Sequence, residues 1–256
     1  MLDLTFEQNF QLRRTILRNI ERDLKSGGFR ACHHQLVRDL VEAMGTLPYN
    51  KKQGCGHCLS FLFDYAPQDL KDYLLRVFLT SKYIIFRRRA YKKLSWDWDA
   101  FYEDAIKDVW DAHHDGDCAR LMIDRFDVEY LNDNFFDLAS SVEESWHFTK
   151  LYLRVSEIDA SKFEHLSHID EITFSYVAAK LGKVFDSETA LAMFERNKYD
   201  DRIGLLVWCF GQMKLWSVLV SIDQNFDEEA IWREKHHLRM EDLGLSESDP
   251  FETLLA

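Results

Sequence analysis

The segment Ile172-Thr-Phe-Ser-Tyr-Val-Ala-Ala-Lys-Leu-Gly182 has the composition of a short apolar α-helix that ends at a glycine. Three similar segments begin near Cys118 (CARLMIDRF), Trp146 (WHFTKLYLRV) and Arg202 (RIGLLVWCFGQM). They follow one another at roughly 25 to 30 residues, a spacing typical of stacked helix pairs. The recurrence predicts an all-α protein.

More polar, amphipathic helices are expected between the apolar ones, over Val128–Ala139, Ala160–Ile169 and Glu188–Lys198. Short side chains stand where an N-cap oxygen would accept hydrogen bonds from the free N–H groups of the next helix. The expected caps are Asp117, Asp170, Ser187 and Asp200. A short amphipathic pair cannot bury its apolar side alone, so we expect each pair to pack on the next.

Helices are also predicted upstream, near 5–25, 29–44, 59–65 and 70–80, with a long loop over 48–56. The most apolar stretch, 203–222, is interrupted by Gln212 and Lys214 and by two glycines. We therefore expect a buried pair of short helices there and no membrane span.

The segment Ser81-Lys-Tyr-Ile-Ile-Phe-Arg-Arg-Arg-Ala-Tyr-Lys-Lys-Leu94, together with the Asp-capped pairs from 117 to about 222, resembles short bacterial HEAT-like repeats. The resemblance covers roughly half of the chain and implies an irregular α-solenoid of antiparallel helix pairs with a concave face. A compact helical bundle is the alternative architecture. HEAT-like DNA glycosylases show that this fold class includes nucleic-acid-binding members, so such a relative is an alternative function.

Charge divides the chain into two regions, a basic one over 1–95 and an acidic one over 96–256. The first holds 17 Lys and Arg against 9 Asp and Glu, and the second holds 15 against 35, within a net charge of −12. Such asymmetry bears on the partners of a protein more than on its fold. The acidic region predicts a partner with a basic surface.

Export is not expected, because the first residues, Met-Leu-Asp-Leu-Thr-Phe-Glu-Gln, place acidic side chains where a secretory signal carries lysines. The five cysteines are odd in number and unevenly spaced, unlike a disulfide framework. Both features suit the reducing cytoplasm.

Cys55-Gly-His-Cys58 is the most conspicuous short motif. It resembles the redox site of disulfide isomerases, but no apolar strand precedes it. With Cys32 and His33 or His34, the two cysteines would supply sulfur and imidazole ligands to a tetrahedral zinc ion. Ordinary half-buried thiols are the simpler interpretation, so no cofactor is expected and zinc remains the alternative.

Two other arrangements would support a metal-dependent helical enzyme. Glu144/His147 and Glu234/His237 each place a carboxylate and an imidazole on one helix face, as in di-iron bundles, and His165 with His168 is a similar group. The pair His114-Asp115 resembles that of helical metal-dependent phosphohydrolases. Each set lacks part of the surrounding pattern, so the sequence favours a non-enzymatic protein.

The basic run Arg87-Arg88-Arg89, with Lys92 and Lys93, lies among aromatic residues that include Trp96. Cations beside stacking rings are typical of nucleic-acid surfaces, whereas a pI near 5.3 is not. Consecutive helical residues point about 100° apart. At least one arginine is therefore expected to pair within the protein, with the acidic helix that holds Asp97, Asp99, Glu103 and Asp104.

The sequence thus favours a protein-binding helical-repeat module, such as an adaptor, a regulator or an inhibitor of the immunity-protein type. Exposed charges and a tryptophan would carry the binding. The residues expected to contact a partner are Arg87, Arg88, Lys92, Trp96, Asp133 and Asp137.

Overall fold

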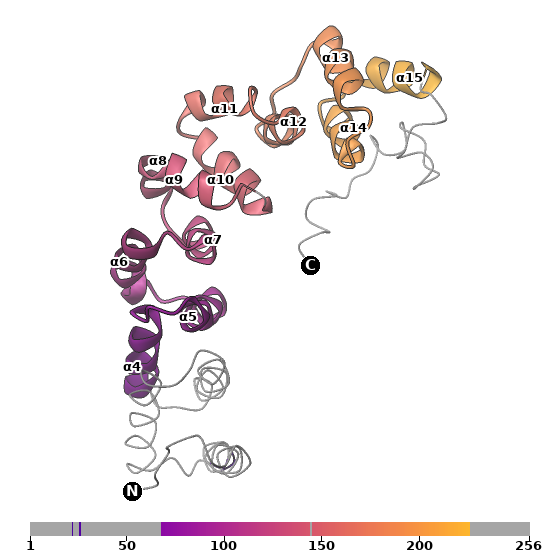
Figure 1. The fold of residues 1–256 in the computed structure, drawn as a ribbon. Helices are drawn as coiled ribbons and strands as arrows, with labels where there is room; N and C mark the ends of the chain where they lie inside the picture. Colours follow the sequence, from indigo (N-terminus) through magenta and orange to yellow (C-terminus); the bar gives the residue numbers. More distant parts are fainter. Residues whose placement is uncertain (1–21, 23–25, 27–67, 144, 226–256) are drawn as a thin grey trace, which may run out of the picture. The chain divides into compact units, whose positions relative to one another are not determined.

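The computed structural model describes residues 22, 26, 68–143 and 145–225 of the chain. Within them lie twelve α-helices and one 3-10 turn, and no strand (Figure 1). The chain forms two compact units, Met1–Phe126 and Asp127–Ala256. The change from basic to acidic sequence near residue 95 therefore falls inside the first unit.

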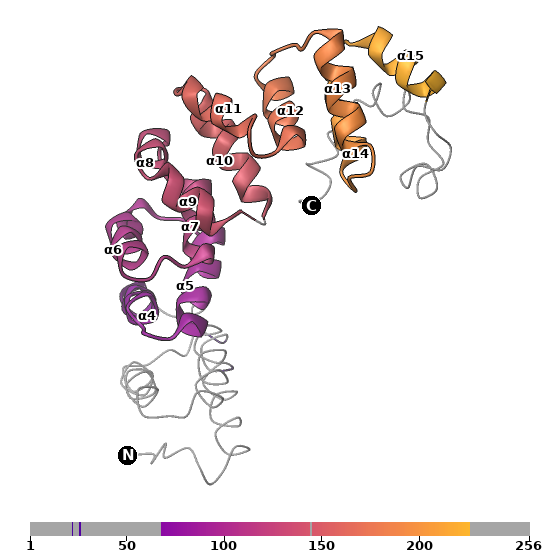
Figure 2. The same ribbon diagram turned by 45° about the horizontal axis from the view of Figure 1, so that its top comes forward.

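The described part of the first unit is built from two consecutive helix pairs. Its elements are α4 (Gln68–Leu79), α5 (Ile84–Trp96), the 3-10 turn η1 (Ala100–Tyr102), α6 (Glu103–His113) and α7 (Gly116–Arg125). Helix α4 packs on α5 and on α6, and α7 packs on α5 and on α6. Figures 1 and 2 show α4 beneath α6 and α5 beneath α7.

The sharp turn between α6 and α7 depends on a histidine. His114 has φ +49° and ψ +41°, and its N–H donates to the Trp110 carbonyl, so it ends α6 in the left-handed conformation. Gly116 is the first residue of α7. The two helices are therefore joined by only two residues, and Asp115 is held close to the core.

Large apolar side chains fill the space between the paired helices of the first unit. The rings of Phe78 in α4 and Phe86 in α5 lie 5.6 Å apart. Leu94, Trp110 and Met122 are almost fully buried in α5, α6 and α7 respectively. This core fixes which side of each helix faces the solvent.

The second unit continues the pattern with shorter helices. Its elements are α8 (Val128–Asp133), α9 (Phe135–Ser141), α10 (Trp146–Ser156), α11 (Ala160–Leu166), α12 (Glu171–Lys180), α13 (Ser187–Asn197), α14 (Ile203–Gln212) and α15 (Trp216–Asn225). The predicted apolar helices correspond to α7, α10, α12 and α14. The stretch 203–222 forms two helices, as expected.

Aspartates cap several of these helices, although not always the predicted ones. Asp170 accepts hydrogen bonds from the N–H groups of Ile172 and Thr173 at the start of α12, as predicted. Asp117 and Ser187 instead lie inside α7 and α13, whose N-caps are the preceding Asp115 and Asp186. Asp200 stands before Arg202, the N-cap of α14.

Helices α10, α12 and α14 contact one another in series in the second unit. Ile172, Phe194, Leu206, Phe210 and Leu219 belong to one buried cluster that joins α12 to α15. We call α4, α6, α8, α9, α11 and α13 the first helices, and α5, α7, α10, α12 and α14 the second helices. Among the described residues, no helix has both the length and the apolarity that a membrane crossing needs.

A buried ion pair joins α5 to the turn that precedes α7. Arg87, only 5% exposed, donates from Nε and Nη2 to the two carboxylate oxygens of Asp115, at 2.6 and 2.9 Å. Its Nη1 donates to the Ser81 carbonyl at 2.7 Å, and the Tyr91 hydroxyl donates to Asp115 at 2.8 Å. Such bidentate pairs fix orientation as well as distance.

The pKa of Asp115 is lowered in this network. Burial of the carboxylate acts to raise it, but the hydrogen bonds from Arg87 and Tyr91 outweigh that effect. A folded-state pKa below the unfolded value means that ionised Asp115 stabilises the fold above the unfolded pKa of about 3.9. That contribution is lost as the pH falls through the folded pKa.

Replacing Asp115 should therefore destabilise the protein in a pH-dependent way. We expect Asp115→Asn to lower the free energy of unfolding at pH 7 by about 2 to 3 kcal/mol, because Arg87 loses its buried partner. The deficit should shrink as the pH falls below about 4, where the carboxyl group of the unfolded chain takes up a proton, and should vanish below the folded pKa, where the wild-type carboxylate is neutralised as well. Urea denaturation across this pH range, followed by circular dichroism, measures both effects.

The matched control is Asp117→Asn, which removes the carboxylate that holds the exposed Arg88. It should change stability by less than about 0.5 kcal/mol. Equal losses in the two variants would contradict the role assigned to the buried pair.

Candidate partner-binding faces

Arg87, one of the residues expected to contact a partner, is not available to one. Its guanidinium is buried and fully engaged by Asp115 and Ser81, so that prediction is wrong. The expectation that an arginine of the run would pair internally is confirmed. Its partner is Asp115, however, and not a carboxylate of the segment that includes Asp97 and Glu103.

Arg88, Lys92 and Trp96 form an exposed stripe along α5. They are spaced by four residues, which places them on one side of the helix. The Arg88 side chain is 61% exposed, and Trp96 is 81% exposed. Nζ of Lys92 lies 5.7 Å from the centroid of the Trp96 ring. The stripe is opposite the side that Arg87 and Leu94 bury.

Helix α7 adds two cations beside this stripe. Nε of Arg88 donates to Asp117 at 2.6 Å, and Nη1 of Arg120 lies 3.5 Å from the other oxygen of that carboxylate. Arg125 donates to the Ser95 carbonyl at 2.5 Å. These contacts join the beginnings and the ends of α5 and α7, so the two helices run parallel and share one face.

We call this surface the α5–α7 face, defined by Arg88, Lys92, Trp96, Arg120 and Arg125. All five side chains are exposed, and these two helices have no exposed Asp or Glu. Sequence reasoning did not single out Arg120 or Arg125. The available signal for Arg120 was its position opposite the apolar residues of the same short helix, whereas Arg125 is the last residue of that helix.

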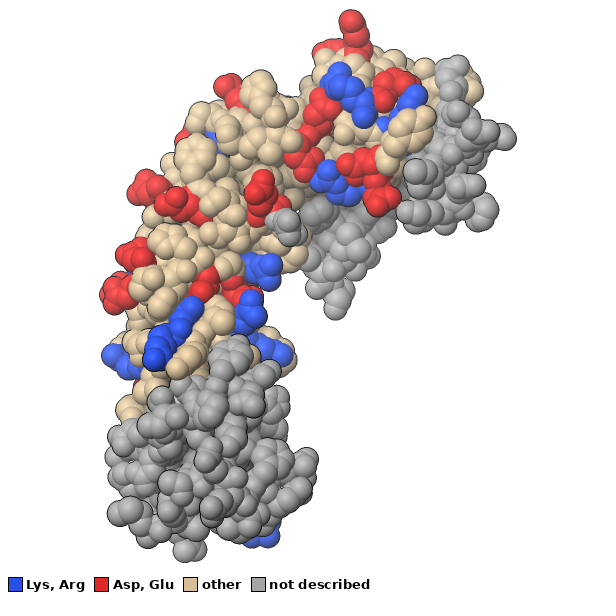
Figure 3. Space-filling model, in the orientation of Figure 1, with Lys and Arg blue, Asp and Glu red and all other residues tan. Residues whose placement is uncertain are grey.

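The first helix α6 carries the opposite charge. Asp104, Asp108 and Asp111 are its exposed carboxylates, spaced so that they lie on one side of the helix. In Figure 3, acidic side chains gather over α6, and Lys and Arg side chains lie over α5. The pair α6 and α7 thus exposes negative charge on its first helix and positive charge on its second helix, whereas α4 and α5 both expose cations.

The second unit shows an acidic surface on its first helices. Asp133 of α8 and Asp137 of α9 are exposed, as expected, and Phe136 beside them is 58% exposed. Nζ of Lys162 in α11 lies 4.5 Å from the Phe136 ring centroid, and the His165 ring meets the Phe136 ring edge-on at 5.5 Å. We call Asp133, Phe136 and Asp137, with Lys162 and His165 of α11 against the ring, the α8–α11 face.

On the first helices of the second unit, the exposed charged residues are almost all acidic. On its second helices α10, α12 and α14, Lys180 is the one charged residue that is exposed. The exposed acidic residues of the first helices are Glu129, Asp133, Asp137, Glu164, Glu188 and Glu195. Exposed carboxylates are therefore concentrated on the first helices α6, α8, α9, α11 and α13, although α13 also exposes Arg196.

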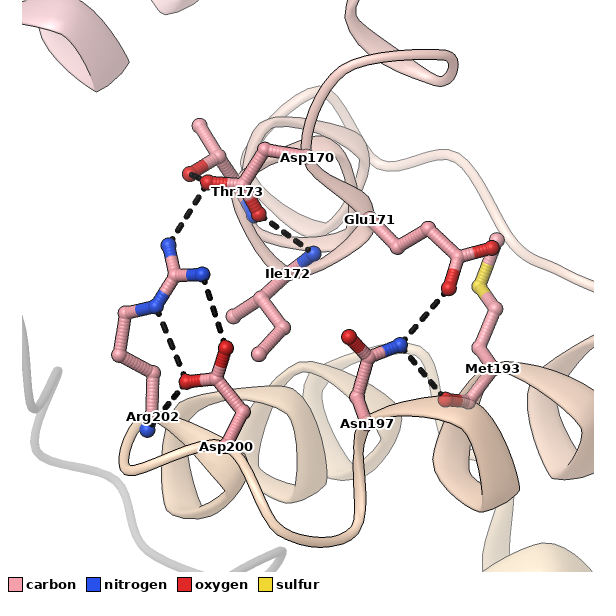
Figure 4. Close-up of polar contacts among 8 residues, drawn as sticks. All are labelled: Asp170, Glu171, Ile172, Thr173, Met193, Asn197, Asp200 and Arg202. Atoms are coloured by element: carbon pink, nitrogen blue, oxygen red, sulfur yellow. Dashed lines mark hydrogen bonds and ion pairs between the residues drawn. The ribbon is translucent and has the colours of Figure 1, made fainter. Parts of the chain in front are cut away.

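A second polar network ties α12 to the segment before α14 (Figure 4). Asp170 accepts from the Thr173 hydroxyl at 2.7 Å and from Nη1 of Arg202 at 2.7 Å. Arg202 also donates to Asp200 from Nε and Nη2. On the other side of α12, Asn197 donates to Glu171 at 2.7 Å. These contacts hold the helices together, and the carboxylates that make them are already hydrogen-bonded within the protein.

The pKa of Asp170 is lowered for the same kind of reason as that of Asp115. Burial acts to raise it, and the hydrogen bonds from Arg202 and Thr173 outweigh the burial. The carboxylate is thus ionised at neutral pH and acts both as a helix cap and as an ion-pair partner.

The proposed metal ligands give no site among the described residues. Cys32, His33, Cys55 and Cys58 lie outside the part of the chain that the structure describes, as do Glu144, Glu234 and His237. His114 ends α6, and both oxygens of Asp115 are engaged by Arg87 and Tyr91. Within 68–143 and 145–225 there is no group of three or more side chains suited to a metal ion.

No family model matches the chain, and no curated protein or solved structure matches it.

The Asp170 network predicts a graded loss of stability. Asp170→Ala removes both the cap of α12 and the partner of Arg202, so we expect a loss of about 2 kcal/mol in the free energy of unfolding. Asp170→Asn keeps a capping oxygen and loses only the ion pair, so its loss should be about half as large. Urea denaturation at pH 7 measures both.

Asp186→Ala is the control, because Asp186 caps α13 through the N–H and hydroxyl of Thr189 and pairs with no arginine of the described residues. Its effect should be smaller than that of Asp170→Ala. If Asp170→Asn were as damaging as Asp170→Ala, the capping contribution assigned to Asp170 would be ruled out.

Proposed function

We propose that this chain is a non-enzymatic, HEAT-like α-solenoid protein that binds another protein, as an adaptor, a regulator or an inhibitor of the immunity-protein type. The architecture is supported by the order of contacts, since each described first helix packs on the second helix of its pair and second helices contact one another. Cys118 and Cys209, both buried and neither in a disulfide, are compatible with a cytoplasmic location.

The observation that carries the binding proposal is the opposite exposed charge of the α8–α11 face and the α5–α7 face, each of which also holds an exposed aromatic ring. Phe136 lies on the α8–α11 face and Trp96 on the α5–α7 face. Aromatic side chains and arginine are enriched at binding hot spots, and complementary charge accelerates encounter. Aromatic residues are enriched in protein–protein interfaces, which is why we assign these two exposed rings to contact with a partner.

For the α8–α11 face, we propose a partner with a basic surface. Asp133 and Asp137 are both exposed and lie close to Phe136 in the sequence. A basic side chain of the partner would meet these carboxylates beside an apolar centre. This arrangement favours a charged rim around a hydrophobic contact, which is the usual anatomy of an interface.

Nucleic-acid binding is the second candidate function, and the α5–α7 face is the observation that favours it. Arg88 and Lys92 precede Trp96 along one side of α5, and a nucleic acid would place phosphates on the cations and a base on the ring. Asp117, between Arg88 and Arg120, weakens this candidate because it would repel a phosphate.

Charge reversal on the α8–α11 face tests the main proposal. A pull-down from lysate of the source organism, followed by mass spectrometry, identifies the partner. Asp133→Lys with Asp137→Lys should then lower its association rate constant about tenfold at low ionic strength and flatten the dependence of that rate on salt. Surface plasmon resonance at several salt concentrations measures both quantities.

Asp104→Lys with Asp108→Lys on α6 is the matched control, since it makes the same charge change at the same spacing on another exposed first helix. It should slow association much less than the Asp133/Asp137 variant does. Equal slowing by the two variants would mean that only total charge matters and would refute the assignment to the α8–α11 face.

A further inference from the structure

The α5–α7 face is built to hold its cations in place. Asp117 fixes Arg88 at 2.6 Å, and the Ser95 carbonyl fixes Arg125 at 2.5 Å. Lys92 is drawn over the Trp96 ring. Side chains that are already ordered lose less conformational entropy when a partner binds. The face therefore presents positive charge in a defined arrangement around one large apolar ring.

Trp96 lies at one end of this arrangement and is the most exposed large hydrophobic residue of the described chain, at 81%. The same side of the unit includes Lys92 one turn earlier and Arg125 at the end of α7. A ligand that covers the ring must therefore approach several cations. Opposite charge in the ligand would compensate for their desolvation.

We propose that the α5–α7 face binds an acidic polypeptide segment of another protein, with an aromatic or aliphatic side chain of that segment packed on Trp96. Its carboxylates pair with Arg88 and Lys92 near the ring, and with Arg120 and Arg125 alongside. This surface and this partner chemistry are distinct from the basic partner assigned to the α8–α11 face, and the proposal does not depend on that one.

The details of the face favour a polypeptide over a nucleic acid. Trp96 is the exposed aromatic residue of α5 and α7, whereas surfaces for single strands offer successive rings to successive bases. Asp117 occupies the space between Arg88 and Arg120. A peptide can place a hydroxyl or amide donor against that carboxylate, and a phosphate backbone has no such group to offer there.

The test is a selection of short random peptides displayed on phage, with the full chain immobilised. Selected peptides should be rich in Asp and Glu and should share a large apolar residue. The affinity for a synthetic copy of a selected peptide should be about tenfold or more weaker in the Arg88→Glu/Lys92→Glu variant. It should be about fivefold weaker in the Trp96→Ala variant.

Arg76→Glu is the matched control, because Arg76 is an exposed cation on the first helix α4 of the same unit. The Arg76→Glu variant should bind the peptide as tightly as the wild type does. Unchanged thermal unfolding of the Arg88/Lys92 and Trp96 variants would show that they keep the fold, since all three residues are exposed.

Three results would overturn the proposal. The first is a selection that yields no acidic consensus, or peptides that bind the Arg88/Lys92 variant as well as the wild type. The second is binding of oligothymidine more tightly than the peptide, with loss in the same variant and a steep decrease with added salt, which would assign the face to nucleic acid. The third is self-association of the chain that the variant abolishes, which would assign it to a second copy.

Discussion

The buried ion pair between Arg87 and Asp115 determines which side of α5 faces the solvent in the first unit. It fastens one side of α5 to the α6–α7 turn. Because helical residues advance by about 100°, Arg88 and Lys92 then point to the other side. The network also explains why three consecutive arginines do not make one basic patch. Arg87 is buried in the ion pair with Asp115, and the neighbouring Arg88 belongs to the α5–α7 face.

The exposed charges differ in sign between helices, so the net charge of −12 does not describe the individual surfaces of the chain. Among Asp, Glu, Lys and Arg, the exposed residues of α6, α8, α9 and α11 are acidic, whereas those of α5 and α7 are basic. Each pair needs its apolar side for its neighbours, so the charged positions are free to differ between its two helices. One chain can thereby offer surfaces of opposite sign.

Much of the fold follows from the sequence, because short-range patterns control it. The apolar segments beginning near Cys118, Trp146, Ile172 and Arg202 correspond to observed helices, and Asp170 caps α12 as its position indicates. The pairing of Arg87 with Asp115 could not be derived, since it depends on how α5 packs against a turn 28 residues away. Likewise, contact of Lys162 with Phe136 requires α9 and α11 to be neighbours. Local periodicity contains no such information.

Hydroxyl-radical footprinting of the tryptophans, read by mass spectrometry, tests the central claim that the structure turns Trp96 outward for a partner. In the free chain, Trp96 should be oxidised rapidly and Trp110, which is 1% exposed, slowly. With a partner bound to the α5–α7 face, the rate at Trp96 should fall while that at Trp216 in the second unit remains unchanged. Slow oxidation of Trp96 in the free chain, or a rate unaffected by that partner, would contradict the account.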